Sequence, residues 1–407
     1  MKLNNAIKRT LINEYAGSEK KETVICHDGF KYMVKKPDPT REIKKRELLP
    51  YQNNVFSEFV GCKVYENIGI PVQDVSLWEY DTKNRKGEIT TKTICLCKDV
   101  REKDENLREF EKISLGSEAE DNDRFTFVEM EELINSVKDK TNMTDKQKEE
   151  YLAFYYDMFI VDALIGNTDR HPGNIAIIVD ENDNFKRICP VYDCGSSFSP
   201  DIPEKNLSSC NVKQIALSVD SAICEDVNGD KRRIRYVNFF DTCENEKVLN
   251  ALKRIVPKID LSEIKRTLDI EPLLSDARKQ FYEECLECRF EKILLKGLEN
   301  SFVLEKAEVP DNIDLYKIYA ENIRDIAALA PFEQLDVMSG ENSYTFRKVS
   351  NKYAISLDEN GVCNGLIPIR SNNDEIRKAI NAFKSLGIDI CSAQLEISEK
   401  EQIKEGI

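Results

Sequence analysis

Three polar residues in the middle of the chain have the types and the spacing that phosphoryl transfer to a hydroxyl requires. Asp169 is followed five residues later by Asn174, and Asp193 stands before a Cys-Gly pair further along the chain. A carboxylate can accept the proton of an attacking hydroxyl, while an amide oxygen and a second carboxylate hold Mg²⁺ against the phosphates. The pattern therefore predicts Asp169 as the catalytic base and Asn174 and Asp193 as metal ligands.

The segments around these residues indicate more than a polar loop. Asp, Asn and Gly are turn residues, so residues 166–174 alone could simply join a helix to a strand. Upstream, however, Thr144 and Gln147 can form a capping box before a run of helical period that reaches Ile165. Downstream, residues 175–179 have the composition of a buried strand. Protein kinases present D-x-x-x-x-N and a following Asp-x-Gly in this setting, so the pattern favours a kinase.

The first hundred residues contain parts that would hold ATP. Gly17 and Ser18 lie in a small-residue turn before a strand, where backbone N–H groups could approach the phosphates closely. The next strand carries Lys35, which would reach the phosphates while Glu58 on the following helix holds it in place. Lys36 is the competing candidate, because its side chain points to the other face of the same strand.

A strand at residues 91–97 would lead into a hinge between two lobes. Cys97 ends this strand, and Lys98 and Asp99 follow it. We predict that the backbone of these three residues meets the adenine edge of ATP. The alternative, a core strand without a nucleotide contact, stays open.

The charge of the chain limits its partners. A net charge of −15 over 407 residues argues against general nucleic-acid binding, because phosphate contacts need clustered Lys and Arg. The compact basic stretch at residues 231–235 is interpreted as a solvated strand after a turn at Asn228 and Gly229, with docking of an acidic peptide as the alternative. An anionic lipid surface would also repel the chain on average. We therefore predict no nucleic-acid partner and no membrane association.

Cysteine usage and the terminus point to a cytoplasmic protein. The chain has 13 cysteines, an odd number with irregular spacing, and only two histidines, so we expect reduced thiols and no zinc. No run of about 18 apolar residues and no secretory signal with an apolar core occurs in the sequence. Secretion as an effector remains an alternative location.

Five sequence motifs resemble the HipA-like serine/threonine kinases, and in particular the CtkA type of bacterial kinase. The resemblance spans roughly residues 10 to 300. The matching motifs are A-G-S-E-K at 16–20, Y-M-V-K-K-P at 32–37, F-S-E-F-V-G-C at 56–62, D-M-F-I-V-D-A-L-I-G-N-T-D-R-H-P-G-N at 157–174 and Y-D-C-G-S at 192–196.

The resemblance implies a two-lobed, protein-kinase-like fold of the α+β class that uses ATP and Mg²⁺ and phosphorylates serine or threonine hydroxyls of proteins, itself included. It implies the same roles for Lys35, Asp169, Asn174 and Asp193. The chain departs from the family at Gly173, where many members carry a lysine, and by having a second lysine at the position of Lys21.

Other functions remain open at this point. D-R-H-x-x-N followed by D-x-G also resembles phosphoinositide kinases, so lipid or small-molecule substrates are an alternative. A second alternative is a nucleotide-binding pseudokinase that acts as a scaffold. Pseudokinases typically lose the base, the lysine or the metal-binding Asp, and this chain keeps candidates for all three, which favours an active enzyme. The biological role could be that of a toxin, a phage-defence protein or an effector.

The predicted domains are a strand-rich N-lobe at residues 1–100, a helical C-lobe at 101–306 and a small α+β accessory domain at 307–407. The accessory domain has no recognisable catalytic residues. It could select substrates, regulate the kinase or bind a regulatory partner, and the sequence does not decide among these roles. Its expected elements are helices at about 313–329 and 373–386, strands at 344–348, 353–357 and 388–396, and a turn at 358–361.

Overall fold

The computed structural model describes residues 2–11, 21–37, 53–83, 87–114, 125–298, 334–339, 342–349, 352–359 and 362–368. The chain divides into two compact units. One consists of Met1–Asp241 with Glu246–Leu294, and the other of Thr242–Asn245 with Leu295–Ile407. The first unit contains every predicted catalytic residue.

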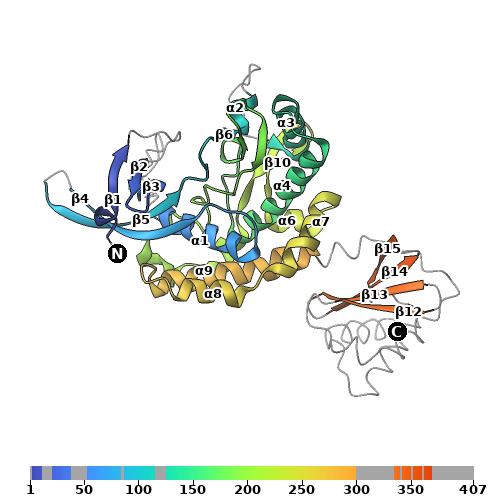
Figure 1. The fold of residues 1–407 in the computed structure, drawn as a ribbon. Helices are drawn as coiled ribbons and strands as arrows, with labels where there is room; N and C mark the ends of the chain where they lie inside the picture. Colours follow the sequence, from blue (N-terminus) through green and yellow to red (C-terminus); the bar gives the residue numbers. More distant parts are fainter. Residues whose placement is uncertain are drawn as a thin grey trace. The chain divides into compact units, whose positions relative to one another are not determined.

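The N-terminal part of the first unit is a five-stranded antiparallel sheet (Figure 1). Its strands, in spatial order, are β1 (Ile7–Leu11), β2 (Lys21–Cys26), β3 (Lys31–Lys35), β5 (Ile89–Lys98) and β4 (Val75–Lys83). One face buries a small apolar core that includes Val24, Val34 and Ile94. Because β3 lies at the centre of the sheet, it is a rigid place from which a lysine can be presented.

Helix α1 (Asn54–Ile68) connects this sheet to the rest of the unit. It ends at Gly69, whose φ of 82° is a left-handed conformation that glycine adopts without a steric penalty. The helix contacts β4 and β5 as well as α4 and α8, and most of its side chains are buried for that reason. Glu58 therefore lies in the interior of the molecule rather than on a solvated helix face.

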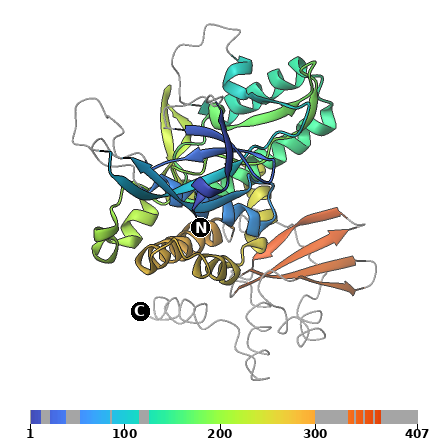
Figure 2. The same cartoon turned by 60° about the vertical axis from the view of Figure 1, so that its left-hand side comes forward.

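The C-terminal part of the first unit is mainly helical. The predicted capping box is present: Thr144 and Gln147 cap α4 reciprocally, and this helix forms the centre of the lobe. Helices α8 and α9 lie side by side below it (Figures 1 and 2). The helices of this part are α2 (Phe110–Ser114), α3 (Phe127–Lys140), α4 (Asp145–Ile165), α5 (Val212–Leu217), α6 (Tyr236–Thr242), α7 (Glu246–Ile255), α8 (Leu261–Asp269) and α9 (Asp276–Arg289), which continues as a π-helix over Phe290–Leu295.

Two small sheets flank α4. One pairs β6 (Asn106–Glu109), β8 (Ala176–Val179) and β9 (Phe185–Ile188), and the other pairs β7 (Phe125–Thr126), β10 (Asp220–Val227) and β11 (Asp230–Arg235). The hairpin of β8 and β9 follows the predicted catalytic loop directly. The basic stretch at 231–235 is a strand, as predicted, and it occupies the edge of its sheet.

The predicted α+β class and two-lobed kinase arrangement are confirmed. The described cysteines are all free thiols, and most of them are buried. Within the described ranges, no helix is long and apolar enough to cross a membrane.

The second unit contains an antiparallel meander of β12 (Gln334–Ser339), β13 (Asn342–Val349), β14 (Lys352–Glu359) and β15 (Val362–Pro368). The strands expected at 344–348 and 353–357 lie within β13 and β14, whereas β12 and β15 were not expected. The turn was placed too early, because Asp358 and Glu359 still pair within the sheet. The expected helices and the strand at 388–396 lie outside the described residues, and the boundary at 307 stays a prediction.

Candidate active site

The end of α4 sets the position of the predicted catalytic loop. Gly166 caps the helix with a φ of 67° and donates its N–H to the Asp162 carbonyl. Asn167, which is completely buried, donates from its amide to Asp162 Oδ1 at 3.0 Å and accepts the N–H of Asp169 at 3.1 Å. The side chain of Asn167 therefore fixes the turn that carries Asp169 away from the helix.

Asp169 and Asn174 are joined through the backbone. Asn174 Nδ2 donates to the Asp169 carbonyl at 2.7 Å, and the His171 N–H donates to the same oxygen at 3.0 Å. Since the nitrogen of the Asn174 amide is used in this bond, Oδ1 is the atom that the side chain can offer to a cation. The loop thus brings together the predicted base and one predicted metal ligand.

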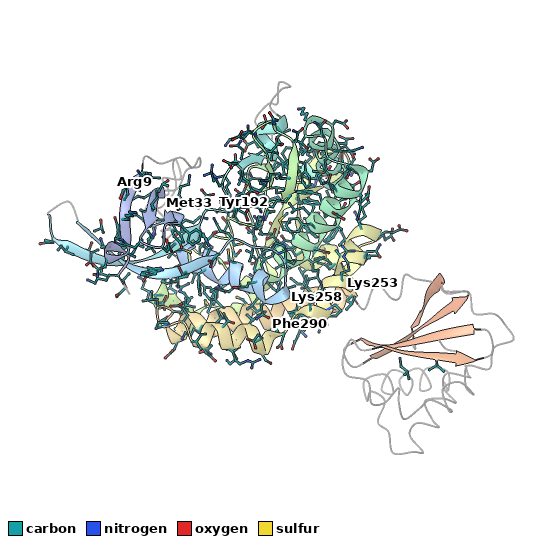
Figure 3. All side chains as sticks on the ribbon, in the orientation of Figure 1. Arg9, Met33, Tyr192, Lys253, Lys258 and Phe290 are labelled. Atoms are coloured by element: carbon teal, nitrogen blue, oxygen red, sulfur yellow. The ribbon has the colours of Figure 1, made fainter. Side chains whose placement is uncertain are left out.

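Lys35 lies between two carboxylates from distant parts of the chain. Its Nζ is 2.8 Å from Glu58 Oε2 and 2.6 Å from Asp193 Oδ1. Lys35 and Glu58 are buried, whereas the Asp193 side chain is 26% exposed. We call these three residues the lysine cluster. Figure 3 labels Met33 on β3 and Tyr192 before Asp193, which locate the two segments that this cluster joins.

The Asp-Cys-Gly segment fits closely against α1. Asp193 has a φ of 59°, a left-handed conformation that Asp and Asn adopt more readily than other non-glycine residues. A Cβ on Gly195 would lie 3.3 Å from Glu58 Oε2 and 3.5 Å from the Asn54 carbonyl oxygen. A glycine at this position therefore lets the segment approach the buried Glu58 carboxylate.

Lys36 belongs to a different environment. Its Nζ is 2.5 Å from Glu22 Oε2 and lies over the Tyr80 ring, 4.6 Å from the centroid. Both charged groups of this pair are partly exposed. The strand alternation thus places Lys35 toward α1 and the Asp-Cys-Gly segment, and Lys36 toward the outer face of the sheet.

Sequence analysis missed one residue that organises the site, Arg170. Its guanidinium is buried and binds both oxygens of Asp162, at 2.9 and 3.2 Å. It also donates to the carbonyls of Tyr192 at 2.5 Å and Asn174 at 3.2 Å. We call Arg170, Asp162 and these two carbonyls the arginine cluster. It ties the catalytic loop to the residue that precedes Asp193.

Electrostatic interactions within the arginine cluster keep the buried Arg170 side chain charged. Burial alone opposes the charged guanidinium, yet the Asp162 carboxylate and the nearby Tyr65 hold the pKa of Arg170 well above its usual range. Asp162 itself could have pointed to Arg170 in the sequence. A carboxylate inside the apolar run at the end of α4 requires a buried partner, and Arg170 is eight residues further along.

The predicted hinge residues are already engaged. Cys97 is buried, and β5 pairs it with Met33 and Val75 on the neighbouring strands. The N–H of Lys98 donates to the Asp74 carbonyl, and the N–H of Asp99 donates to the Lys31 carbonyl, both at 2.9 Å. Adenine binding at this hinge therefore stays a prediction, and these two N–H groups would have to give up internal bonds to make it.

Two further sequence features have different outcomes. Gly17 and Ser18 lie outside the described residues. At Gly173, a Cβ would lie 2.5 Å from Glu111 Oε2 and 2.8 Å from His171 Cε1. The end of the flexible Glu111 side chain therefore lies next to Gly173, and it would have to move to make room for a longer side chain at this position.

The donor atoms available fit Mg²⁺ bound together with a nucleotide. Among the described residues, no group of three or more His, Cys, Asp or Glu side chains could hold a metal ion by itself. Mg²⁺ in phosphoryl-transfer enzymes is usually held by one or two carboxylates and by the substrate phosphates. Asn174 and Asp193 supply an amide and a carboxylate of this kind.

Comparison with known proteins identifies the family. No family model matches the chain. The chain is 30% identical over 295 residues to the serine/threonine-protein kinase CtkA of Helicobacter pylori strain J99, a match that covers 69% of this chain and 82% of the relative. The crystal structure of a Helicobacter pylori proinflammatory kinase CtkA is similar with a TM-score of 0.61 at 25% identity, covering 75% of this chain and 98% of that one.

A weaker structural likeness, with a TM-score of 0.43 at 16% identity, is to the complex of HipA, HipB and operator DNA from Shewanella oneidensis; it covers 70% of this chain and 66% of that one. The solved CtkA kinase is covered almost completely, whereas about a quarter of this chain has no counterpart in it. The predicted family and enzyme class are confirmed: the chain belongs to the CtkA-type serine/threonine-protein kinases.

Proposed function

We propose that the chain transfers the γ-phosphoryl group of ATP to serine or threonine hydroxyls of proteins, with Asp169 as the base and Mg²⁺ bound by Asn174 and Asp193. The observation that carries this proposal is the lysine cluster. A buried ammonium group is held between a helix carboxylate and the carboxylate of the Asp-Cys-Gly segment, as kinases require for gripping phosphates.

Lys35 would act by exchanging one partner. Its bond to the buried Glu58 fixes the direction of the ammonium group, while its bond to the partly exposed Asp193 can be replaced by a phosphate oxygen. The Asp193 carboxylate would then be available to hold Mg²⁺. When bound, Mg²⁺ would neutralise negative charge on the phosphates. Glu58 thus supports Lys35 without contacting the nucleotide.

Asp169 would take the proton of the attacking hydroxyl. Its backbone is held by Asn167 on one side and by the Asn174 amide on the other, so the carboxylate leaves a rigid loop. A base within hydrogen-bond reach of the hydroxyl oxygen contributes roughly 10²–10⁴-fold to the rate. The hydroxyl oxygen would bond to the γ-phosphorus as its O–H bond breaks and the proton passes to Asp169. The bond between the γ-phosphorus and the β–γ bridging oxygen would break at the same time, and ADP would leave with that electron pair.

Two alternatives are less well supported. A pseudokinase lacks a base, a lysine or a metal-binding Asp, and this chain has candidates for all three, of which Lys35 and Asp193 are in contact. A lipid or small-molecule kinase is disfavoured by the likeness to a serine/threonine-protein kinase over most of both chains. Autophosphorylation, a regulatory partner at the second unit, the cytoplasmic location and the toxin, defence or effector role stay predictions.

The test is radiolabelled phosphoryl transfer from ATP by the purified full chain, to itself and to a mixture of proteins. Asp169→Asn should lower the rate by roughly 10²–10⁴-fold while leaving ATP binding near normal. Asp183→Asn is a matched control, because Asp183 is an exposed surface residue with a φ of 62°, which Asn tolerates. A wild-type chain that binds ATP and transfers nothing would establish the pseudokinase alternative instead.

A further inference from the structure

The edge strand β11 presents three cations on one face, and they differ in their partners. Side chains two apart on a strand share a face, so Lys231, Arg233 and Arg235 lie together. Lys231 Nζ is 2.5 Å from Glu129 Oε1, and Arg235 Nε is 2.9 Å from Asp220 Oδ1. Within the described ranges, the exposed Arg233 makes its only hydrogen bond to a neutral group, the Thr168 carbonyl, at 3.2 Å.

The charge of Arg233 is located next to the catalytic loop. Thr168 directly precedes the proposed base Asp169, so the guanidinium lies beside the catalytic loop. The chain as a whole carries a net charge of −15, so a cation whose only hydrogen bond to the described residues goes to a backbone carbonyl is a local exception. Lys231 and Arg235, its neighbours on the same face of the strand, are neutralised by ion pairs, which leaves Arg233 as the cation of that face without one among the described residues.

We propose that Arg233 binds a carboxylate of the protein substrate, so that the enzyme prefers serine or threonine residues with an Asp or Glu nearby in sequence. The inference rests on the proposed kinase function and specifies its substrate class. An arginine has five N–H donors in a planar fork and binds carboxylates in pairs of hydrogen bonds. The single bond to Thr168 leaves most of these donors available.

The reach of an extended peptide defines where the acidic residue must stand. A bound segment advances about 3.3 Å per residue, and Arg233 lies next to the loop that would receive the hydroxyl. An acidic side chain within about three residues of the phosphoacceptor is therefore close enough to meet the guanidinium.

The test compares matched peptides that contain Asp or Asn at each of the three positions on either side of one serine. The quantity measured is the ratio of kcat/KM for the Asp peptide over the Asn peptide. We expect a ratio of about three to five for wild type at the best position, since a charge pair at an exposed site gives a modest preference. Arg233→Ala should bring the ratio close to one, and Arg233→Glu should favour a Lys peptide.

Two variants on the same strand serve as controls. Arg235→Ala removes a cation already paired with Asp220, and Arg232→Ala removes an exposed cation on the opposite face. Both should keep the wild-type ratio. An equal loss in all three variants, or a wild-type ratio of one, would overturn the inference. So would a loss of activity in Arg233→Ala that leaves the ratio unchanged, because Arg233 would then only support the Thr168 carbonyl.

A binding measurement separates this inference from the proposed function. Fluorescence anisotropy of the labelled Asp and Asn peptides, with a non-hydrolysable ATP analogue, needs no turnover. Tighter binding of the Asp peptide to wild type but not to Arg233→Ala supports the inference even if no phosphoryl transfer is found. Equal binding of both peptides by wild type contradicts it even if the enzyme is active.

Discussion

Two buried ion clusters lie within the same unit, and they differ in how completely their charges are satisfied. In the arginine cluster, the guanidinium and its carboxylate are both buried, and two backbone carbonyls take further N–H groups. In the lysine cluster, Lys35 and Glu58 are equally buried, but the second carboxylate, Asp193, is partly exposed. The first arrangement has no exchangeable partner, whereas the second has one.

We therefore expect the arginine cluster to stabilise the fold and the lysine cluster to take part in phosphoryl transfer. Removing one member of a buried pair leaves the other charge without a partner, so substitutions in the arginine cluster should lower the stability of the protein. Because Lys35 can exchange Asp193 for a phosphate oxygen, its substitution should lower kinase activity. Substitutions in each cluster test this difference.

The largest effect is expected for Arg170→Met. The change leaves Asp162 buried without its main counter-charge and should lower the free energy of unfolding by about 3–5 kcal/mol. Urea unfolding measures this. The control is Arg254→Met, since Arg254 binds Asp157 of the same helix α4 at 2.6 Å but is 42% exposed, and such a pair contributes about 0–1 kcal/mol. Equal losses for both variants would contradict the structural role of the arginine cluster.

A loss of activity is expected next, for Lys35→Met. Without the ammonium group, kcat/KM should fall by roughly 10²–10³-fold, the usual effect of losing one electrostatic contact to the transferring group. Lys36→Met is the matched control and should stay near wild type, because Lys36 pairs with Glu22 on the outer face. The reverse result would shift the assignment by one residue.

A double variant sharpens this second test. Lys35→Met leaves the buried Glu58 carboxylate without its contact to Lys35 Nζ, so the melting temperature should also fall. Adding Glu58→Gln removes the uncompensated charge and should recover stability without recovering activity. If the double variant regains activity, Lys35 is not required for phosphate binding.

Asp193→Asn should have a smaller effect, on nucleotide affinity. Asn tolerates the φ of 59° at this position, so the substitution removes charge from the proposed metal ligand without straining the backbone. Affinity for MgATP, measured by calorimetry, should fall by about tenfold because Mg²⁺ prefers carboxylate oxygen. Metal-free ATP should bind the variant at least as tightly as wild type, because Lys35 then has no Asp193 carboxylate to exchange for a phosphate. Unchanged MgATP affinity would exclude Asp193 as a ligand.

The smallest effect concerns an ion pair away from both clusters, between Glu105 and Arg187 at 2.6 Å. Burial raises the pKa of Glu105, but hydrogen bonds from the Arg187 side chain and the Glu102 N–H lower it by a larger amount. The resulting pKa is about 2, compared with an ordinary value of 4.5. A lowered pKa means that its stabilisation is present above about pH 4.5 and is lost as the pH falls toward 2. We expect Glu105→Gln to cost about 1 kcal/mol at pH 7.

The measurement is urea unfolding of wild type and Glu105→Gln over this pH range. The difference between the two proteins should shrink on acidification while kinase activity at pH 7 is unaffected. A difference that grows as the pH falls would show that the pair does not stabilise the ionised form of Glu105.

The sequence alone determined those features of the protein that depend on near neighbours. The capping box at Thr144 and Gln147 predicted the start of α4, because a cap involves residues three apart. The spacing from Asp169 to Asn174 predicted one loop that holds both residues, and strand alternation separated Lys35 from Lys36. The α+β class of the kinase, by contrast, was predicted from the family resemblance.

Only the tertiary structure decided which distant groups meet. Lys35 and Asp193 are 158 residues apart, and Arg170 joins two loops whose closeness depends on the packing of α4 against its neighbours. Engagement of the Lys98 and Asp99 N–H groups and the position of Glu111 over Gly173 were likewise invisible in the sequence. Periodicity and caps record local backbone preferences, whereas ion pairs and close approaches depend on how whole elements pack, because burial and distance set their energies.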